Sequence, residues 1–122
     1  MIIEAACGCN VGKIRQNNED NFYFDGKCLE QEHSGLKHPA CMESSLKGGL
    51  SFAVFDGMGG ENFGEIASYA AARQMQLTER TLADFFIPER KYLERVIEQL
   101  NDAVVNAQKE MCTDRMGATM VS

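Results

Sequence analysis

The sequence has few basic residues for its content of acidic ones. Twelve Lys and Arg residues stand against 18 Asp and Glu residues, which gives a formal net charge of −6 at pH 7. Proteins that bind nucleic acids take much of their affinity from a basic face that neutralises phosphates. We therefore do not expect nucleic acid among the partners of this 122-residue chain.

Long apolar runs are missing as well. A transmembrane helix needs roughly 18 or more consecutive apolar residues, and no stretch of the sequence approaches that length. The first residues, Met1–Glu4, lack the basic and apolar regions of a signal peptide. These absences predict a soluble, cytoplasmic chain with no membrane contact in this segment.

The cysteines form no recognisable pattern. There are five, an odd number, and none belongs to a C-x-x-C pair, so the sequence offers neither a disulfide framework nor a strong zinc motif. Cys28, His33, His38 and Cys41 are spaced unlike any common structural zinc site. Histidines in such a polar stretch are usually surface residues, and reduced thiols are the expectation for a cytoplasmic protein.

The most informative stretch is Leu50–Gly60, LSFAVFDGMGG. An apolar run of strand length stops at Asp56 and is followed by glycines that tolerate tight turns and close backbone approach. Such a strand delivers a carboxylate into a turn, which suits Mg²⁺ and Mn²⁺ because these ions prefer oxygen ligands. The alternative is an ordinary Asp-Gly hairpin turn.

A second stretch, Gly12–Asp20 (GKIRQNNED), sets Arg15 three residues before Asn18 and ends in Glu19 and Asp20. A planar guanidinium suits phosphate, and neighbouring carboxylates suit a hard cation. Charged runs are also typical of solvated loops, so this stretch is informative only in combination with the first.

These two stretches, together with Gly64–Ser68 (GEIAS) and Met116–Thr119 (MGAT), resemble the metal-dependent protein serine/threonine phosphatases of type 2C, and the bacterial branch most closely. The motifs follow the family's order from about Ala5 to the last residue. The resemblance implies an α/β (α+β) fold, with residues 1–122 as the N-terminal half of one four-layer α-β-β-α sandwich of antiparallel sheets. We expect the domain to be truncated at Ser122, where an apolar run has just begun.

The resemblance also implies a chemistry. The full-length parent would hydrolyse phosphoserine and phosphothreonine in proteins through a water bridging two or more Mn²⁺ or Mg²⁺ ions. Asp56 would bridge the ions and Gly57 would add its carbonyl, while Asp20 and Glu19 would hold metal-bound waters. Arg15 would bind the substrate phosphate with its fork of donors.

Two features depart from the family pattern. Met58 stands where animal members carry a histidine that is assigned as the general acid, and a thioether has no proton to give; bacterial relatives with methionine there are active. The aspartates that complete both metal positions in the family lie beyond Ser122. We therefore expect the fragment alone to be inactive and to bind manganese weakly.

Three other interpretations come from different classes. A non-catalytic pseudophosphatase, or phosphoprotein-binding regulatory module, would keep Arg15 but lose the later aspartates. A nucleotide-binding module would use the glycines after Asp56, but the sequence lacks both G-x-G-x-x-G and a P-loop lysine. Finally, the half-domain would self-associate through an exposed sheet edge.

The remaining pattern predicts the elements around these motifs. Residues 2–14 are expected to be extended, and Phe22–Phe24 to form a strand that ends at an Asp25-Gly26 turn. Residues 27–49 are predicted to be an inserted polar loop, with a flexible excursion favoured over a role in selecting substrates. A helix is expected over 61–77, and a second one starts at Pro88 with a buried stripe. That stripe comprises Leu93, Val96, Ile97, Leu100, Val104, Ala107 and Met111.

Overall fold

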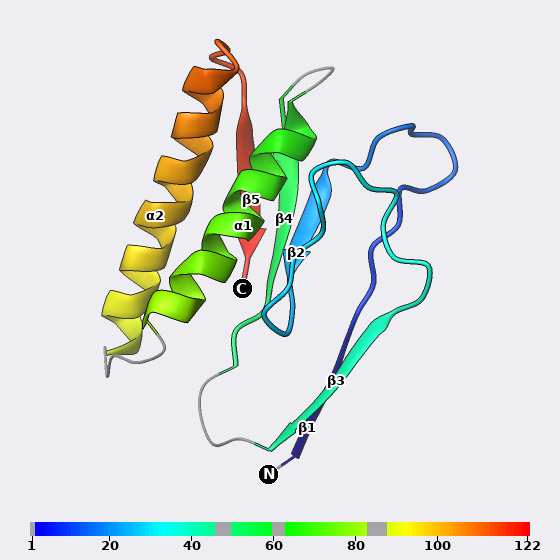
Figure 1. Ribbon diagram of the computed structural model, residues 1–122, viewed down its shortest axis with the longest axis vertical. Coiled ribbons are helices and arrows are strands. Elements are labelled where there is room, and N and C mark those ends of the chain that lie inside the picture. Colours follow the sequence, from blue (N-terminus) through cyan, green and yellow to red (C-terminus); the bar gives the residue numbers. More distant parts are fainter. Residues whose placement is uncertain (1, 46–49, 60–62, 83–87) are drawn as a thin grey trace.

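The computed structural model describes residues 2–45, 50–59, 63–82 and 88–122. Within them the chain forms two helices and two antiparallel sheets, which confirms the predicted α+β class (Figure 1). The elements in chain order are β1 (Ile2–Cys7), β2 (Asp20–Tyr23), β3 (Ala40–Ser45), β4 (Ala53–Met58), α1 (Gly64–Leu82), α2 (Glu89–Glu110) and β5 (Gly117–Val121).

The larger sheet has the strand order β2-β4-β5, and both helices cover the same face of it (Figure 1). Side chains alternate along β4, so Phe55 is fully buried beneath the helices while Val54 and Met58 lie on the opposite face, 57% and 59% exposed. The core around Phe55 also contains Tyr23, Ala53, Ala71, Ala72, Met75, Val96 and Leu100. One face of the sheet is therefore packed, and the other carries exposed apolar side chains.

The two helices run antiparallel to each other across the sheet (Figure 1). Buried alanines of α1, at positions 67, 71 and 72, allow its backbone to approach the strands closely. The hydroxyl of Thr78, which is also buried, donates a hydrogen bond of 2.6 Å to the Oε1 of Gln99 and so links α1 to α2. Both predicted helices are confirmed; residues 61 and 62 of the first lie outside the described part of the chain.

The predicted buried stripe of α2 is only partly correct. Val96 and Leu100 are buried, but Leu93, Ile97 and Met111 are exposed, Ile97 by 55%. The reason is that α2 packs mainly against α1 and reaches only β5 at the margin of the sheet (Figure 1). The apolar stripe of α2 therefore has little to pack against along part of the helix.

The prediction of a loop over 27–49 is wrong for residues 40–45, which form β3. This strand pairs with β1 in an antiparallel register that sets Ala5 opposite Met42 and Cys7 opposite Ala40. Its sequence, ACMESS, contains no β-branched or aromatic residue, so propensity gave no strand signal. Pairing with β1 decides its conformation instead, and the two strands form a separate ribbon that extends away from the helices (Figure 1).

The predicted turn at Asp25-Gly26 is confirmed. The N–H of Phe24 donates to the carbonyl of Lys27 at 2.9 Å, and the reverse bond is 3.0 Å long. Both central residues have positive φ, 50° for Asp25 and 72° for Gly26. Asp-Gly is the preferred pair for a two-residue hairpin turn of this hand.

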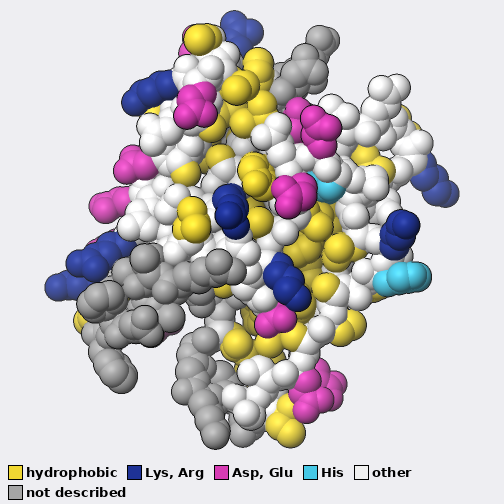
Figure 2. Space-filling model, viewed as in Figure 1, with side chains coloured by type: hydrophobic (Ala, Val, Ile, Leu, Met, Phe, Trp, Pro, Cys, Tyr) yellow, Lys and Arg dark blue, Asp and Glu magenta, His cyan; other side chains and the backbone are white. Residues whose placement is uncertain are grey.

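Both signs of charge are dispersed over the face seen in Figure 1. Figure 2 shows Lys and Arg side chains separated from one another by acidic and apolar side chains. The described residues on this face therefore present no continuous basic stripe of the kind that binds a nucleic-acid backbone.

Candidate functional site

Three of the four predicted motif segments meet on one face of the larger sheet. Asp20 of β2 lies directly opposite Asp56 of β4, and Asp56 lies directly opposite Thr119 of β5. Residues that face each other across an antiparallel pair project to the same side of the sheet. Stretches that are far apart in the sequence therefore present a row of three oxygen-bearing side chains, on the face away from the helices.

The hydrogen-bond pattern places Asp20 and Asp56 especially close together. The N–H of Gly57 donates to the carbonyl of Glu19 at 3.0 Å, so Glu19 and Gly57 form a hydrogen-bonded pair. Because such pairs alternate along antiparallel strands, Asp20 and Asp56 form a non-hydrogen-bonded pair, in which the Cα atoms are about 4.5 Å apart and the side chains are nearest. The structure thus brings together the two carboxylates that the sequence analysis assigned to one site.

Burial and the neighbouring carboxylate perturb the titration of Asp20. Partial burial, followed by the negative charge of Asp56, raises the pKa of Asp20 above its ordinary value, and Arg15 acts in the opposite direction. Two facing carboxylates without a counter-charge between them are unfavourable, and a bound cation removes that penalty. Carboxylate oxygens are the donors that Mg²⁺ and Mn²⁺ prefer.

A cleft of about 570 Å³ opens beside the pair. Arg15, Glu19, Asp20 and Asp56 line it, together with residues 10–14, 17 and 18. Four of the predicted site residues therefore share one cavity. Within the described part of the chain, no group of three or more His, Cys, Asp or Glu side chains is arranged to hold a metal. The donor set fits a hard divalent cation but supplies only part of its coordination shell.

Arg15 and Glu19 contact each other rather than separate partners. Nη1 of Arg15 lies 2.7 Å from Oε2 of Glu19, and the arginine side chain is 71% exposed. The guanidinium has five N–H donors in a fixed fork, so the ion pair with Glu19 leaves other N–H groups that can bind a phosphate. Glu19 is predicted to hold a metal-bound water. In the structure its carboxylate forms an ion pair with Arg15, the residue predicted to bind the substrate phosphate.

Gly57 lies where β4 packs against the start of α1. The predicted stop of the strand at Asp56 and the alternative hairpin turn are both wrong, because β4 continues through Gly57 to Met58. A Cβ atom at Gly57 would lie 1.9 Å from the carbonyl oxygen of Gly64 and 2.7 Å from that of Glu19. Gly57 is buried against the start of α1 and is not among the residues that line the cleft. Glycine is required at this position because any side chain would prevent the close packing of β4 against α1.

Gly59 and Gly64 complete this contact. A Cβ at Gly59 would lie 2.5 Å from Phe63, and one at Gly64 would lie 2.8 Å from Cδ of Glu19. The absence of side chains at these positions allows α1 to begin directly against β4 and Glu19. Gly60, the last glycine of the run, lies outside the described residues.

Sequence reasoning missed one residue beside the site. His33 belongs to the stretch predicted as a flexible loop, yet it is partly buried: burial lowers the pKa of its imidazole, and nearby Asp20 acts in the opposite direction. A histidine in a polar stretch gives no periodic signal, and its approach to Asp20 depends on a loop path that the sequence does not reveal.

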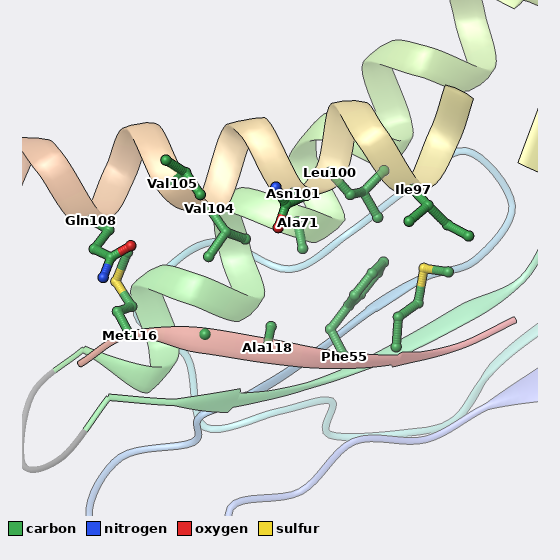
Figure 3. Close-up of a pocket in the computed structure, with 12 residues that line it drawn as sticks. Phe55, Ala71, Ile97, Leu100, Asn101, Val104, Val105, Gln108, Met116 and Ala118 are labelled. Carbon is green, nitrogen blue, oxygen red and sulfur yellow. The ribbon is translucent and has the colours of Figure 1, made fainter. Parts of the chain in front are cut away.

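A separate apolar pocket of about 420 Å³ lies between α2 and β5 (Figure 3). Ile97, Leu100 and Val104 extend from the helix toward Phe55 and Ala118 in the sheet (Figure 3). Its polar side chains are the neutral amides Asn101 and Gln108, so it offers no acid, base or nucleophile. Of these two cavities, only the cleft at Asp20 and Asp56 carries ionisable side chains.

Comparison of the chain with protein-family models, with curated proteins and with solved structures finds no match. In the described part of the chain, neither helix combines the length and the apolar character that crossing a membrane requires. The function proposed below accordingly depends on the geometry of the site and on the sequence motifs.

Proposed function

We propose that this chain is the N-terminal half of a type 2C protein phosphatase domain, and that the complete protein hydrolyses phosphoserine and phosphothreonine in proteins with Mn²⁺ or Mg²⁺. The observation that carries this proposal is the register that aligns Asp20, Asp56 and Thr119 across three adjacent strands. Each comes from a different motif of the resemblance, and chance similarity gives no reason for them to lie side by side. The soluble, cytoplasmic setting expected from the sequence belongs to this proposal.

The carboxylates of Asp20 and Asp56 would hold the cation, and their electrostatic repulsion favours its binding. A divalent ion held there supplies Lewis acidity, which lowers the pKa of water and neutralises charge on phosphoryl oxygens. Arg15, at the exposed rim of the same cleft, would bind and orient the substrate phosphate. Gly57 does not line this cleft, so we leave it out of the ligand set.

Met58 constrains how the leaving group is protonated. It follows Asp56 by two residues in β4 and is 59% exposed on the same face. A thioether cannot donate a proton, so this position supplies no general acid. Protonation of the departing serine or threonine oxygen would fall to solvent or to another group.

The open face of the larger sheet supports the half-domain part of the proposal. Val54, Met58 and Val121 are 57%, 59% and 75% exposed there. Exposed β-branched side chains on a sheet face are normally covered by a second layer. In the four-layer arrangement that the resemblance implies, a second sheet would cover this face and complete the metal site.

Manganese titration of the 122-residue chain tests the metal site. Water-proton relaxation should detect weak binding by the unaltered chain and a clear loss of it in Asp56→Asn, which keeps the shape but removes the charge. Asp102→Asn, at an exposed position of α2, is the matched control and should bind as the unaltered chain does. Equal binding by all three proteins would refute the site.

Activity tests the other half of the proposal. With Mn²⁺ and p-nitrophenyl phosphate, the 122-residue chain should show no turnover, because its cleft supplies too few fixed ligands for two cations. In the full-length parent, Asp56→Asn should abolish activity without loss of the fold. A parent that keeps its rate with this change would rule out the assignment.

A further inference from the structure

The backbone N–H of Asp20 has its partner outside the sheet. Because Asp20 and Asp56 form a non-hydrogen-bonded pair, this N–H points to the outer side of β2, away from β4. In the sheet formed by the described residues β2 is an edge strand, so no further strand accepts a hydrogen bond from it. Backbone donors in folded chains are normally paired, and here a side chain provides the acceptor.

That acceptor is the amide of Asn18, a residue only 6% exposed. Its Oδ1 accepts a hydrogen bond of 3.2 Å from the N–H of Asp20, and its Nδ2 donates one of 3.2 Å to the Sγ of Cys9. A backbone N–H can only donate, so the amide oxygen has to face Asp20 and the nitrogen is left for Cys9. Both ends of the buried amide are therefore engaged, which fixes its orientation.

Cys9 gives this amide a fixed anchor. The carbonyl of Cys9 accepts a hydrogen bond of 2.8 Å from the N–H of Leu36. Two residues on, the N–H of Val11 donates to the carbonyl of Ser34 at 3.1 Å. A Cβ atom at Gly35 would lie 2.2 Å from the carbonyl oxygen of Cys9, so the two segments are in close contact. Backbone pairing with residues 34–36 therefore holds the segment that carries Cys9.

Residues 10–19 lead from this anchor to Asp20 and supply most of the residues that line the cleft. The amide of Asn18 closes this loop, because it joins Cys9 before the loop to Asp20 after it. On the inner side of β2, the N–H of Gly57 donates to the carbonyl of Glu19. The start of β2 is thus held from both sides, by β4 on one and by the amide on the other.

We propose that Asn18 is a positioning residue of the metal site, which ties the backbone of Asp20 to Cys9 and so keeps the Asp20 carboxylate opposite that of Asp56. This inference rests on the proposed function, because it assigns Asn18 a part in the same site. Asn18 binds neither cation nor phosphate in this proposal; it acts through Asp20.

The first test measures Mn²⁺ affinity of the 122-residue chain by water-proton relaxation. Asn18→Leu keeps the side-chain volume and removes both hydrogen bonds. Asn18→Ser retains an oxygen that can accept from the N–H two residues on, but loses the bond to Cys9. Asn106→Leu, at an exposed position of α2, is the matched control. Circular dichroism and urea denaturation show which variants remain folded.

A second pair of variants tests the anchor and leaves Asn18 in place. Cys9→Val has a similar volume and offers no acceptor to the amide nitrogen of Asn18. Cys9→Ser keeps an acceptor at the same position. A difference between these two variants therefore reports the hydrogen bond and not the packing of residue 9.

We expect about tenfold weaker Mn²⁺ binding for Asn18→Leu, the lower end of the loss seen when a group supporting a metal ligand is removed. Asn18→Ser should recover most of the affinity, because it keeps the bond to Asp20. Cys9→Val should bind more weakly than Cys9→Ser, which should match the unaltered chain and Asn106→Leu. A folded Asn18→Leu that binds as the unaltered chain does overturns the inference, and so does an Asn18→Ser as weak as Asn18→Leu.

The Cys9 pair keeps the inference falsifiable if Asn18→Leu does not fold. Weaker binding by Cys9→Val than by Cys9→Ser then supports the role of the amide. Equal affinities of the two variants overturn the anchoring of Asp20 through Cys9, whatever the outcome at position 18.

Asp56→Asn separates the two proposals. If the unaltered chain binds Mn²⁺, Asp56→Asn loses it and the Asn18 and Cys9 variants all keep it, the inference about Asn18 is wrong and the metal site stands. If Asp56→Asn binds as well as the unaltered chain, the proposed metal site fails, and the role given to Asn18 fails with it.

Discussion

Arg15 and Glu19 form an ion pair at the rim of the cleft, with Nη1 of the arginine 2.7 Å from Oε2 of the glutamate. The arginine side chain is largely exposed, and exposed pairs of this kind typically contribute about 0–1 kcal/mol to stability. The pair therefore matters less for holding the fold together than for where the guanidinium points.

Glu19→Gln tests this view. The change keeps the side-chain volume against Gly64 but removes the charge, so the free energy of unfolding should fall by less than about 1 kcal/mol. Urea denaturation of the variant and the unaltered chain measures the difference. Arg15→Gln should give a similarly small change, and a loss of more than about 2 kcal/mol in either variant would show that the pair is structural.

Gly57→Ala should be among the most damaging single changes in the chain. The added methyl group would lie 1.9 Å from the carbonyl oxygen of Gly64, and neither backbone can move without separating β4 from α1. We expect a loss above about 3 kcal/mol, or failure to fold. Gly8→Ala is the control, because a Cβ there meets nothing within 4 Å, and its effect should be within about 0.5 kcal/mol.

The glycines after Asp56 show which property of a glycine the sequence cannot predict. The run after Asp56 was interpreted as a turn because glycine is the usual residue at positive φ. In the structure Gly57 lies inside β4 and is needed because α1 begins against it. Sequence composition cannot distinguish these two uses of glycine, since the difference depends on which backbone lies opposite.

The predicted meeting of Asp20 with Asp56 came from the motifs, and the structure shows its cause in the register of β2 with β4. Helices and the hairpin at Asp25 were predictable because periodicity and turn chemistry are local signals. β3 was not, because pairing with a distant strand overrides its weak propensity. The position of His33 near Asp20 was not predictable either, because it depends on the path of the polar stretch between β2 and β3.

Phe55 and Val54 are neighbours on opposite faces of β4 and should respond very differently to truncation. Phe55 is fully buried, and Phe55→Ala should lower the free energy of unfolding by about 3–5 kcal/mol through lost burial and a residual cavity. Val54→Ala, at a side chain 57% exposed, should change it by less than about 1 kcal/mol. Urea denaturation resolves the two. A large loss of unfolding free energy in Val54→Ala would mean that this face is covered in solution, as self-association through it would require. Sedimentation of the variant beside the unaltered chain would then show whether the two differ in association state.

Asp20→Asn gives a pH-dependent test of the carboxylate pair. Burial and the charge of Asp56 raise the pKa of Asp20 in the folded chain, so the folded state holds the proton more tightly than the unfolded state does. The free energy of unfolding should therefore fall as the pH rises from the ordinary pKa of aspartate through the raised value.

Asparagine mimics the protonated side chain at every pH, so Asp20→Asn should be more stable than the unaltered chain at neutral pH and equal to it near pH 3, below the ordinary pKa of about 3.9. Saturating Mn²⁺ should narrow or reverse the difference at neutral pH, because only the unaltered chain offers both carboxylates to the ion. Urea denaturation at both pH values, with and without Mn²⁺, measures these effects, and Asp102→Asn controls for the loss of one surface charge. If Asp20→Asn is no more stable than the unaltered chain at neutral pH, the two carboxylates do not repel each other as their register requires.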